Sequence, residues 1–90
     1  MKKLSLDEAV RATGASKKAV SAIGDVMRDR MSRTDEQMAA AAPAIARHGR
    51  WSQDAVRHAR LALQLAGLLR DTGKYYPTSN GGRARVWQRA

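Results

Sequence analysis

Ninety residues are near the lower end of what one hydrophobic core can hold together, so the length predicts a single domain. The chain has no cysteine, which excludes disulfides and thiolate metal sites and fits a reducing compartment. It carries 17 Lys and Arg against 8 Asp and Glu, a formal net charge of +9. This excess favours a polyanion as partner, and an acidic protein surface would match it equally well.

The positive charge gathers at the two ends of the chain. Residues 1–33 hold 8 basic and 4 acidic residues, whereas residues 34–73 hold 5 basic and 4 acidic ones. Residues 74–90 hold 4 basic residues and no acidic one. Two cationic ends around a nearly neutral middle are typical of a protein that straddles a nucleic acid.

Neither apolar window of the sequence is long enough for a membrane span. Met38–Ala46 and Leu61–Leu69 are both shorter than the roughly 20 residues that a spanning helix needs. Asp7 and Glu8 follow the N-terminal lysines before any apolar run, which argues against a signal peptide. We therefore expect a soluble cytoplasmic protein with no membrane partner.

The first 31 residues predict two short helices. Ser5 and Glu8 have the spacing of a capping box, which opens a helix to about Ala12 that Thr13-Gly14 ends. Ser16 can cap a second helix. Its apolar residues recur on one face: Val20, Ile23, Met27 and Met31.

An alanine-rich third helix is predicted from Thr34 to His48. Thr34 and Gln37 form a second capping box, Pro43 kinks the helix or opens a new turn, and Gly49 ends it. Either its Met38–Ala46 face or the preceding Val20–Met31 helix could supply a dimer surface.

The longest predicted helix begins after Ser52 and runs from Gln53 to about Asp71, with Gly73 closing it. Its apolar row should make it the central, buried element of the domain. Its first half also carries a polar stripe with helical spacing: Gln53, Arg57, Arg60 and Gln64.

A β-hairpin is predicted after this helix. Its strands would be Lys74–Pro77 and Arg83–Gln88, joined through the tight-turn dipeptide Asn80-Gly81. An isolated hairpin is barely stable in water, so this one must pack on the helices. We expect its tip, Thr78–Gly82, to project into solvent. The side chains able to pack there are Tyr75, Tyr76, Val86 and Trp87, and of the two tyrosines one is expected to be buried and the other to reach a phosphate.

These elements predict a mainly α domain with a C-terminal β-hairpin, about four helices in all. Residues 1–15 would be an N-terminal helical extension, residues 16–73 the helical core and residues 74–90 the hairpin.

The segment Ser52–Trp87 resembles the C-terminal half of a winged helix-turn-helix DNA-binding domain. The resemblance rests on the run Leu63-Gln-Leu-Ala-Gly-Leu-Leu69, followed by a basic hairpin that ends in Arg85-Val-Trp87. It implies that Val20–Met31 and Thr34–His48 are the first two helices and that Gly49-Arg-Trp51 is the turn. The helix after Ser52 would then enter the major groove.

The same resemblance implies two sets of DNA contacts. The residues expected to read bases are Ser52, Gln53, Arg57 and Arg60. Those expected to bind phosphates are Arg50, Lys74, Tyr76, Arg83 and Arg85. No nearby acid is expected to neutralise Lys74, Arg83 or Arg85.

A second reader of DNA is possible near the N-terminus. Leu6–Ile23 resembles a plain helix-turn-helix, with Val10, Gly14 and Val20 at the expected offsets. It would expose Lys17 and Lys18 to phosphates. Both segments could contact one DNA molecule, so this alternative stays open.

Catalysis and cofactor binding are not expected. His48 and His58 have no second ligand pair at zinc-like spacing, and the serines lack a nucleophile-elbow context. Trp51 and Trp87 are expected to be core anchors, and four aromatic residues poorly supply a single-strand stacking surface. No metal, cofactor or small-molecule ligand is predicted.

The sequence therefore favours sequence-specific binding of double-stranded DNA by a homodimeric transcriptional regulator such as a phage or plasmid repressor. Two alternatives remain open at this stage. One is a small basic phage-type inhibitor of an acidic protein surface or nucleic-acid channel. The other is a plasmid partition or replication accessory protein that binds DNA.

Overall fold

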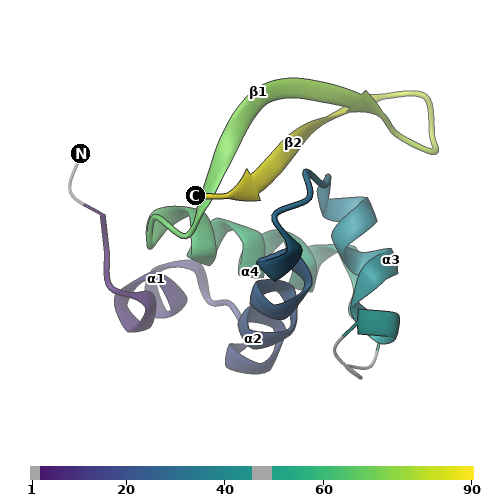
Figure 1. Ribbon diagram of the computed structural model, residues 1–90. Coiled ribbons are helices and arrows are strands. Elements are labelled where there is room, and N and C mark those ends of the chain that lie inside the picture. The colour runs from purple at the N-terminus through teal and green to yellow at the C-terminus, as the bar shows by residue number, and fades with distance from the viewer. Residues whose placement is uncertain (1–2, 46–49) are drawn as a thin grey trace.

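The structure is a computed structural model that describes residues 3–45 and 50–90 (Figure 1). It is mainly helical with a C-terminal antiparallel hairpin, as predicted. No helix within those ranges is long and apolar enough to cross a membrane. The elements, in chain order, are α1 (Leu6–Thr13), α2 (Lys17–Val26), the 3-10 turn η1 (Met27–Asp29), α3 (Asp35–Ile45), α4 (Gln53–Leu65), β1 (Leu69–Pro77) and β2 (Arg83–Arg89).

The predicted helix starts are confirmed by their hydrogen bonds. The Ser5 hydroxyl accepts from the amide of Glu8 at 3.2 Å, while the Glu8 carboxylate accepts from the amide of Ser5 at 3.0 Å. Thr34 and Gln37 make the same reciprocal pair. Ser16 and Ser52 cap α2 and α4 through their hydroxyls. Each cap satisfies an amide that has no partner inside its helix.

Helix α4 is the central element of the core. Helices α1, α2 and α3 all pack against it, and the hairpin arches over the helices (Figure 1). Its side chains Val56, Ala59, Ala62 and Leu63 are buried. The largest fully buried side chains from the other helices are Ile23, Val26, Met27 and Met38. Trp87 of β2 completes the same cluster.

Several apolar residues of the two predicted dimer surfaces pack inside the chain's own core. Val20, Ile23 and Met27 of the α2 and η1 segment are buried inside the chain's own core, because α4 supplies the apolar surface that covers them. Met38 is buried in the same way. Met31, predicted to share the α2 face, is 59% exposed, because α2 ends at Val26 and the chain then turns through η1.

The long helix ends six residues earlier than predicted, at Leu65 instead of Asp71. Gly67 has φ of 76°, and its amide donates to the carbonyl of Gln64 at 2.9 Å. The amide of Leu68 donates to the carbonyl of Leu63 at 2.9 Å, which completes a Schellman motif. Gly67 and not Gly73 is therefore the helix stop, and the residues after it belong to β1.

The hairpin strands are longer than predicted and contain an irregularity. Asp71 pairs with Trp87 and Tyr75 pairs with Arg85, so β1 carries extra residues between these two pairs. Gly73 lies in this bulge with φ of 78°. The connection is a five-residue loop over the predicted tip, Thr78–Gly82, closed by hydrogen bonds between Thr78 and Gly82. Gly81 has φ of 87° in this loop, which fits its expected place in the turn.

Only half of the predicted hairpin packing is present. Val86 and Trp87 are buried, as predicted. Tyr75 and Tyr76 are 52% and 54% exposed, which corrects the expectation that they pack on the helices. The tip does not project freely either, because the Ser79 hydroxyl donates to a carboxylate oxygen of Glu36 in α3 at 3.3 Å.

Arg33 ties the end of the α2 segment to β2. Its backbone exchanges two hydrogen bonds of 2.8 Å with Trp87, which adds a one-residue bridge to the hairpin. Its guanidinium donates to both carboxylate oxygens of Asp29 at 2.8 Å and to the carbonyl of Val26 at 3.1 Å. These bonds fix the turn between α2 and α3.

Arg60 joins three elements. Its guanidinium donates to both carboxylate oxygens of Asp35 in α3 at 3.1 Å and lies 4.4 Å from the ring centroid of Trp87 in β2. It also donates to Gln64 at 3.2 Å. The side chains of Arg60 and Asp35 are 15% and 22% exposed, so water screens this ion pair far less than a surface pair.

Acid should weaken the fold partly through Asp29. The hydrogen bonds from Arg33, and then the bond from the Met31 amide, lower the pKa of Asp29 from 3.8 to about 2. A carboxyl whose pKa is lower in the folded state stabilises it above pH 3.8, and this stability is lost as the pH falls towards 2. Asp29→Asn should therefore show a shallower loss of unfolding free energy over that interval in urea titrations.

Arg33→Gln should also make the loss of unfolding free energy shallower over the same pH interval, because it removes the partner of Asp29. The double variant should add little to either single one. Additive effects of the two substitutions would show that the pair is not the cause.

Replacing Arg60 should destabilise the domain. Arg60→Leu leaves the Asp35 carboxylate partly buried without its cation, and we expect a loss of about 2 kcal/mol in urea unfolding. Arg57→Leu, on an exposed part of the same helix, is the matched control and should change the free energy by less than about 0.5 kcal/mol. Equal effects of the two variants would contradict this role of Arg60.

Candidate nucleic-acid interface

The first turn of α4 presents polar side chains to solvent. Ser52 accepts the amide of Ala55 at 3.1 Å, so its hydroxyl is occupied by the helix cap. Gln53 and Arg57 are exposed and lie on one face of the helix. Arg57 donates to Asp54 at 3.0 Å, and both side chains of this pair are exposed. Exposed pairs contribute little free energy, so Arg57 can exchange Asp54 for an external acceptor at small cost.

The polar stripe of α4 becomes less exposed towards the C-terminal end of the helix. Gln53 and Arg57 are accessible, whereas Arg60 and Gln64 are partly covered by α3 and the hairpin. The guanidinium of Arg60 is already held by Asp35 and Trp87. Arg60 therefore has a structural role and is not part of the proposed interface.

The hairpin carries a cluster of cations around one tyrosine. The guanidinium carbons of Arg83 and Arg85 lie 5.7 Å and 5.6 Å from the ring centroid of Tyr75. Arg83 and Arg85 are exposed, so the cluster presents two positive charges and a half-exposed aromatic ring to solvent. Lys74 and Tyr76 are also exposed on β1, and the pairing of Tyr76 with Ala84 places Tyr76 on the other face of the hairpin.

Asp71 lies against this cluster, which the sequence did not predict. Its carboxylate accepts from the guanidinium of Arg85, so the expectation that no acid neutralises the hairpin cations is wrong for Arg85. The bulge causes this contact: it sets Asp71 against Trp87 and Tyr75 against Arg85 in the strand register. The only sequence signal was that Asp71 is the one acid after Asp54.

The α4 stripe reaches the hairpin at Arg60, whose guanidinium lies 4.4 Å from the ring centroid of Trp87 in β2. On the hairpin itself, the amide of Gly73 and then the hydrogen bond and charge of Arg85 hold the pKa of Asp71 below its usual value, and the charge of Arg60 adds a smaller contribution in the same direction. The stripe that begins at Gln53 therefore contacts the hairpin through Arg60.

The remaining predicted phosphate contacts lie in two different places. Arg50 is exposed just before α4 begins. Lys17 and Lys18 are exposed in the first turn of α2, at the end of this helix far from the hairpin (Figure 1). His48, the predicted end of the third helix, and Gly49, the first residue of the predicted turn, lie outside the described residues.

The N-terminal pair of helices has the predicted connection. Helices α1 and α2 are joined by three residues that begin at Gly14, which has φ of 69° and closes α1. Both helices pack on α4. They place Lys17 and Lys18 on a surface separate from the hairpin cluster, so a single straight DNA segment would meet one of the two surfaces first.

No group of three His, Asp or Glu side chains in the described part of the chain could hold a metal ion. No family model, curated protein or solved structure matches this chain.

Proposed function

We propose that this protein binds double-stranded DNA with sequence preference and acts as a transcriptional regulator. The observation that carries the proposal is the contact of Arg60 with Trp87, which joins α4 to the hairpin. Helix α4 exposes Gln53 and Arg57 before this contact, and the hairpin presents Lys74, Arg83 and Arg85 to solvent. Amide and guanidinium groups pair with base edges, while cations on a hairpin meet phosphates.

The order of elements supports a winged helix-turn-helix assignment within this proposal. Three helices, α2, α3 and α4, precede the hairpin, and the backbone bridge of Arg33 to Trp87 falls between the first two of them. Helix α4 would enter the major groove by its N-terminal turn, where the positive end of the helix dipole also favours phosphate. The hairpin would lie along the adjacent backbone as the wing.

Selection of preferred duplexes from a random pool, followed by a salt titration, tests the proposal. About six phosphate contacts predict that affinity falls roughly a thousandfold between 50 and 200 mM salt. A palindromic preference would indicate a two-fold dimer. Absence of duplex binding at about 50 mM salt would overturn the proposal and favour an acidic protein partner instead.

Substitutions in α4 and in the hairpin should have different effects on DNA binding. Arg57→Ala should reduce the preference between selected and random duplexes, with a loss of about 1–3 kcal/mol on the selected site. Arg83→Ala should weaken binding to both duplexes equally and lower the salt slope by about one unit. Fluorescence anisotropy on both duplexes measures the two effects.

The matched control is Lys17→Ala with Lys18→Ala, on the surface away from the hairpin. If that double variant weakens binding more than Arg57→Ala and Arg83→Ala together, the N-terminal helix pair is the reader and the proposed role of α4 is wrong.

Removing the charge of Asp71 should strengthen duplex binding. Asp71→Asn keeps an acceptor oxygen for the amide of Gly73 but releases Arg85 from its ion pair. The gain should be several-fold at about 50 mM salt, fade at about 200 mM, and raise the salt slope by about one unit. Asp25→Asn, which removes the acid paired with Arg28 outside the proposed DNA interface, is the control for a simple change of net charge. Unchanged or weaker binding by Asp71→Asn would show that Arg85 does not face DNA.

A further inference from the structure

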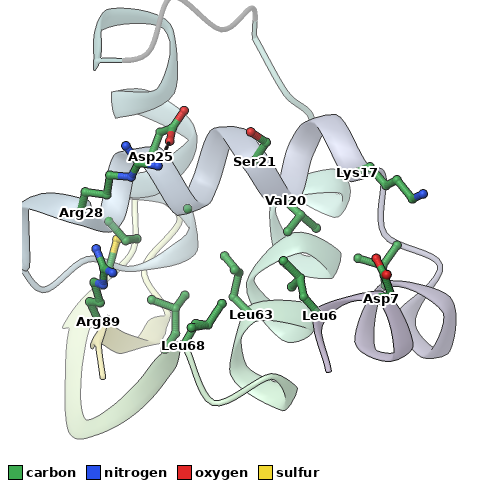
Figure 2. A pocket seen from close by; sticks show the side chains of 14 residues that line it. Leu6, Asp7, Lys17, Val20, Ser21, Asp25, Arg28, Leu63, Leu68 and Arg89 are labelled. Carbon is green, nitrogen blue, oxygen red and sulfur yellow. Dashed lines mark ion pairs between the residues drawn. The ribbon is translucent and has the colours of Figure 1, made fainter. Parts of the chain in front are cut away.

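An apolar groove lies between α1 and α2, at the opposite end of α4 from Ser52 (Figure 2). Leu6 of α1 and Leu68, just after α4, form its walls and are 39% and 43% exposed. Val20 and Leu63 form its floor and are buried. The groove has a volume of about 410 Å³, within the range of sites that bury a ligand or an anchor side chain. None of the hairpin residues in the proposed DNA interface lines it.

Gly24 leaves one position on the α2 side of this groove without a side chain. It lies inside α2, where glycine costs roughly 1 kcal/mol of helix stability relative to alanine. A Cβ added at Gly24 would meet nothing within 4 Å, so the packing of this chain gives no reason for glycine there. The open wall permits the backbone of another molecule to approach α2 closely.

Cations mark both ends of the groove. Lys17 stands at one end, and Arg28 with Arg89 stand at the other (Figure 2). Arg28 pairs with Asp25 at 3.3 Å, and Asp7 lies near Lys17, so two of the cations have an acid beside them. Arg89 is exposed at the end of β2. Lys17 and Arg28 lie about three helical turns apart, roughly 16 Å.

We propose that this groove binds an amphipathic helix of a partner protein, one that carries acidic residues at both ends of its apolar stripe. Anchors at positions i, i+3 and i+7, which span about two turns of helix, would pack against Leu6, Leu63 and Leu68. The acidic residues would meet Lys17 and Arg89. Because the groove and the hairpin surface are separate, this binding does not depend on the proposed DNA binding.

The charge of the protein argues against a second copy in the groove. Each copy carries a formal net charge of +9, so two copies repel one another as a whole. Like charges placed opposite one another oppose association, whereas an acidic helix gains from the same cations.

A synthetic peptide tests the proposal on the full chain. The probe is a fluorescein-labelled 15-residue peptide, roughly four turns long, with leucines at i, i+3 and i+7 and glutamates at both ends. It should bind in anisotropy titrations, and a peptide with lysines in place of the glutamates should not. Gly24→Leu should weaken binding by about tenfold or more because its side chain enters the groove. That variant should melt no lower than the parent, since the added side chain meets open space.

A charge exchange supplies the second arm. Lys17→Glu with Arg89→Glu should weaken the glutamate peptide and allow the lysine peptide to bind. The matched control is Arg11→Glu with Lys18→Glu, an equal change of charge on α1 and α2 outside the groove lining.

Three outcomes would overturn the proposal. They are no binding of the glutamate peptide up to about 100 µM, equal losses from the two charge exchanges, and a dimer of the protein alone that Gly24→Leu dissociates. The last outcome would assign the groove to a second copy. Duplex binding by Gly24→Leu should match the parent, so failure of the DNA proposal and failure of this one are distinguishable.

Discussion

The guanidinium of Arg60 lies between the carboxylate of Asp35 and the ring of Trp87, and this contact holds the hairpin to the helices. A two-stranded hairpin has too little apolar surface to be stable by itself. Here Trp87 enters the core, its backbone pairs with Arg33, and Arg60 covers the outer side of its ring. One arginine thus joins α3, α4 and β2, and it does so partly out of water, where an ion pair is screened least.

The cations of the protein fall into two groups, those that hold the fold together and those that are exposed. Arg33 holds Asp29, four residues before it, and Arg60 holds Asp35 of α3; both pairs serve the stability of the fold. Arg83 and Lys74 are exposed, while Arg57 and Arg85 are exposed and yet paired with Asp54 and Asp71. In the proposed complex, a DNA phosphate and the carboxylate of Asp71 would therefore compete for the guanidinium of Arg85.

The two proposed surfaces lie at different ends of α4. Its exposed first turns carry Gln53 and Arg57, whereas Leu63 near its other end lies at the floor of the apolar groove beside α1. Because one rigid helix carries both, the protein could hold a DNA segment and an acidic helix at once. A chain of this size would then act as an adaptor that brings a partner to a DNA site.

The sequence by itself determined the helix starts, since the capping side chains at Ser5, Ser16, Thr34 and Ser52 act on amides within a few residues. It also determined the existence of a basic hairpin and the burial of Trp87. The sequence-based interpretation placed the end of α4 at Gly73, because Gly67 and Gly73 are both plausible stops and only packing chooses between them. The tertiary structure alone decided which cations are exposed. Arg57 and Arg60 share one helical stripe, but Asp35 is 25 positions away from Arg60, and a contact at that separation exists only after the chain has folded.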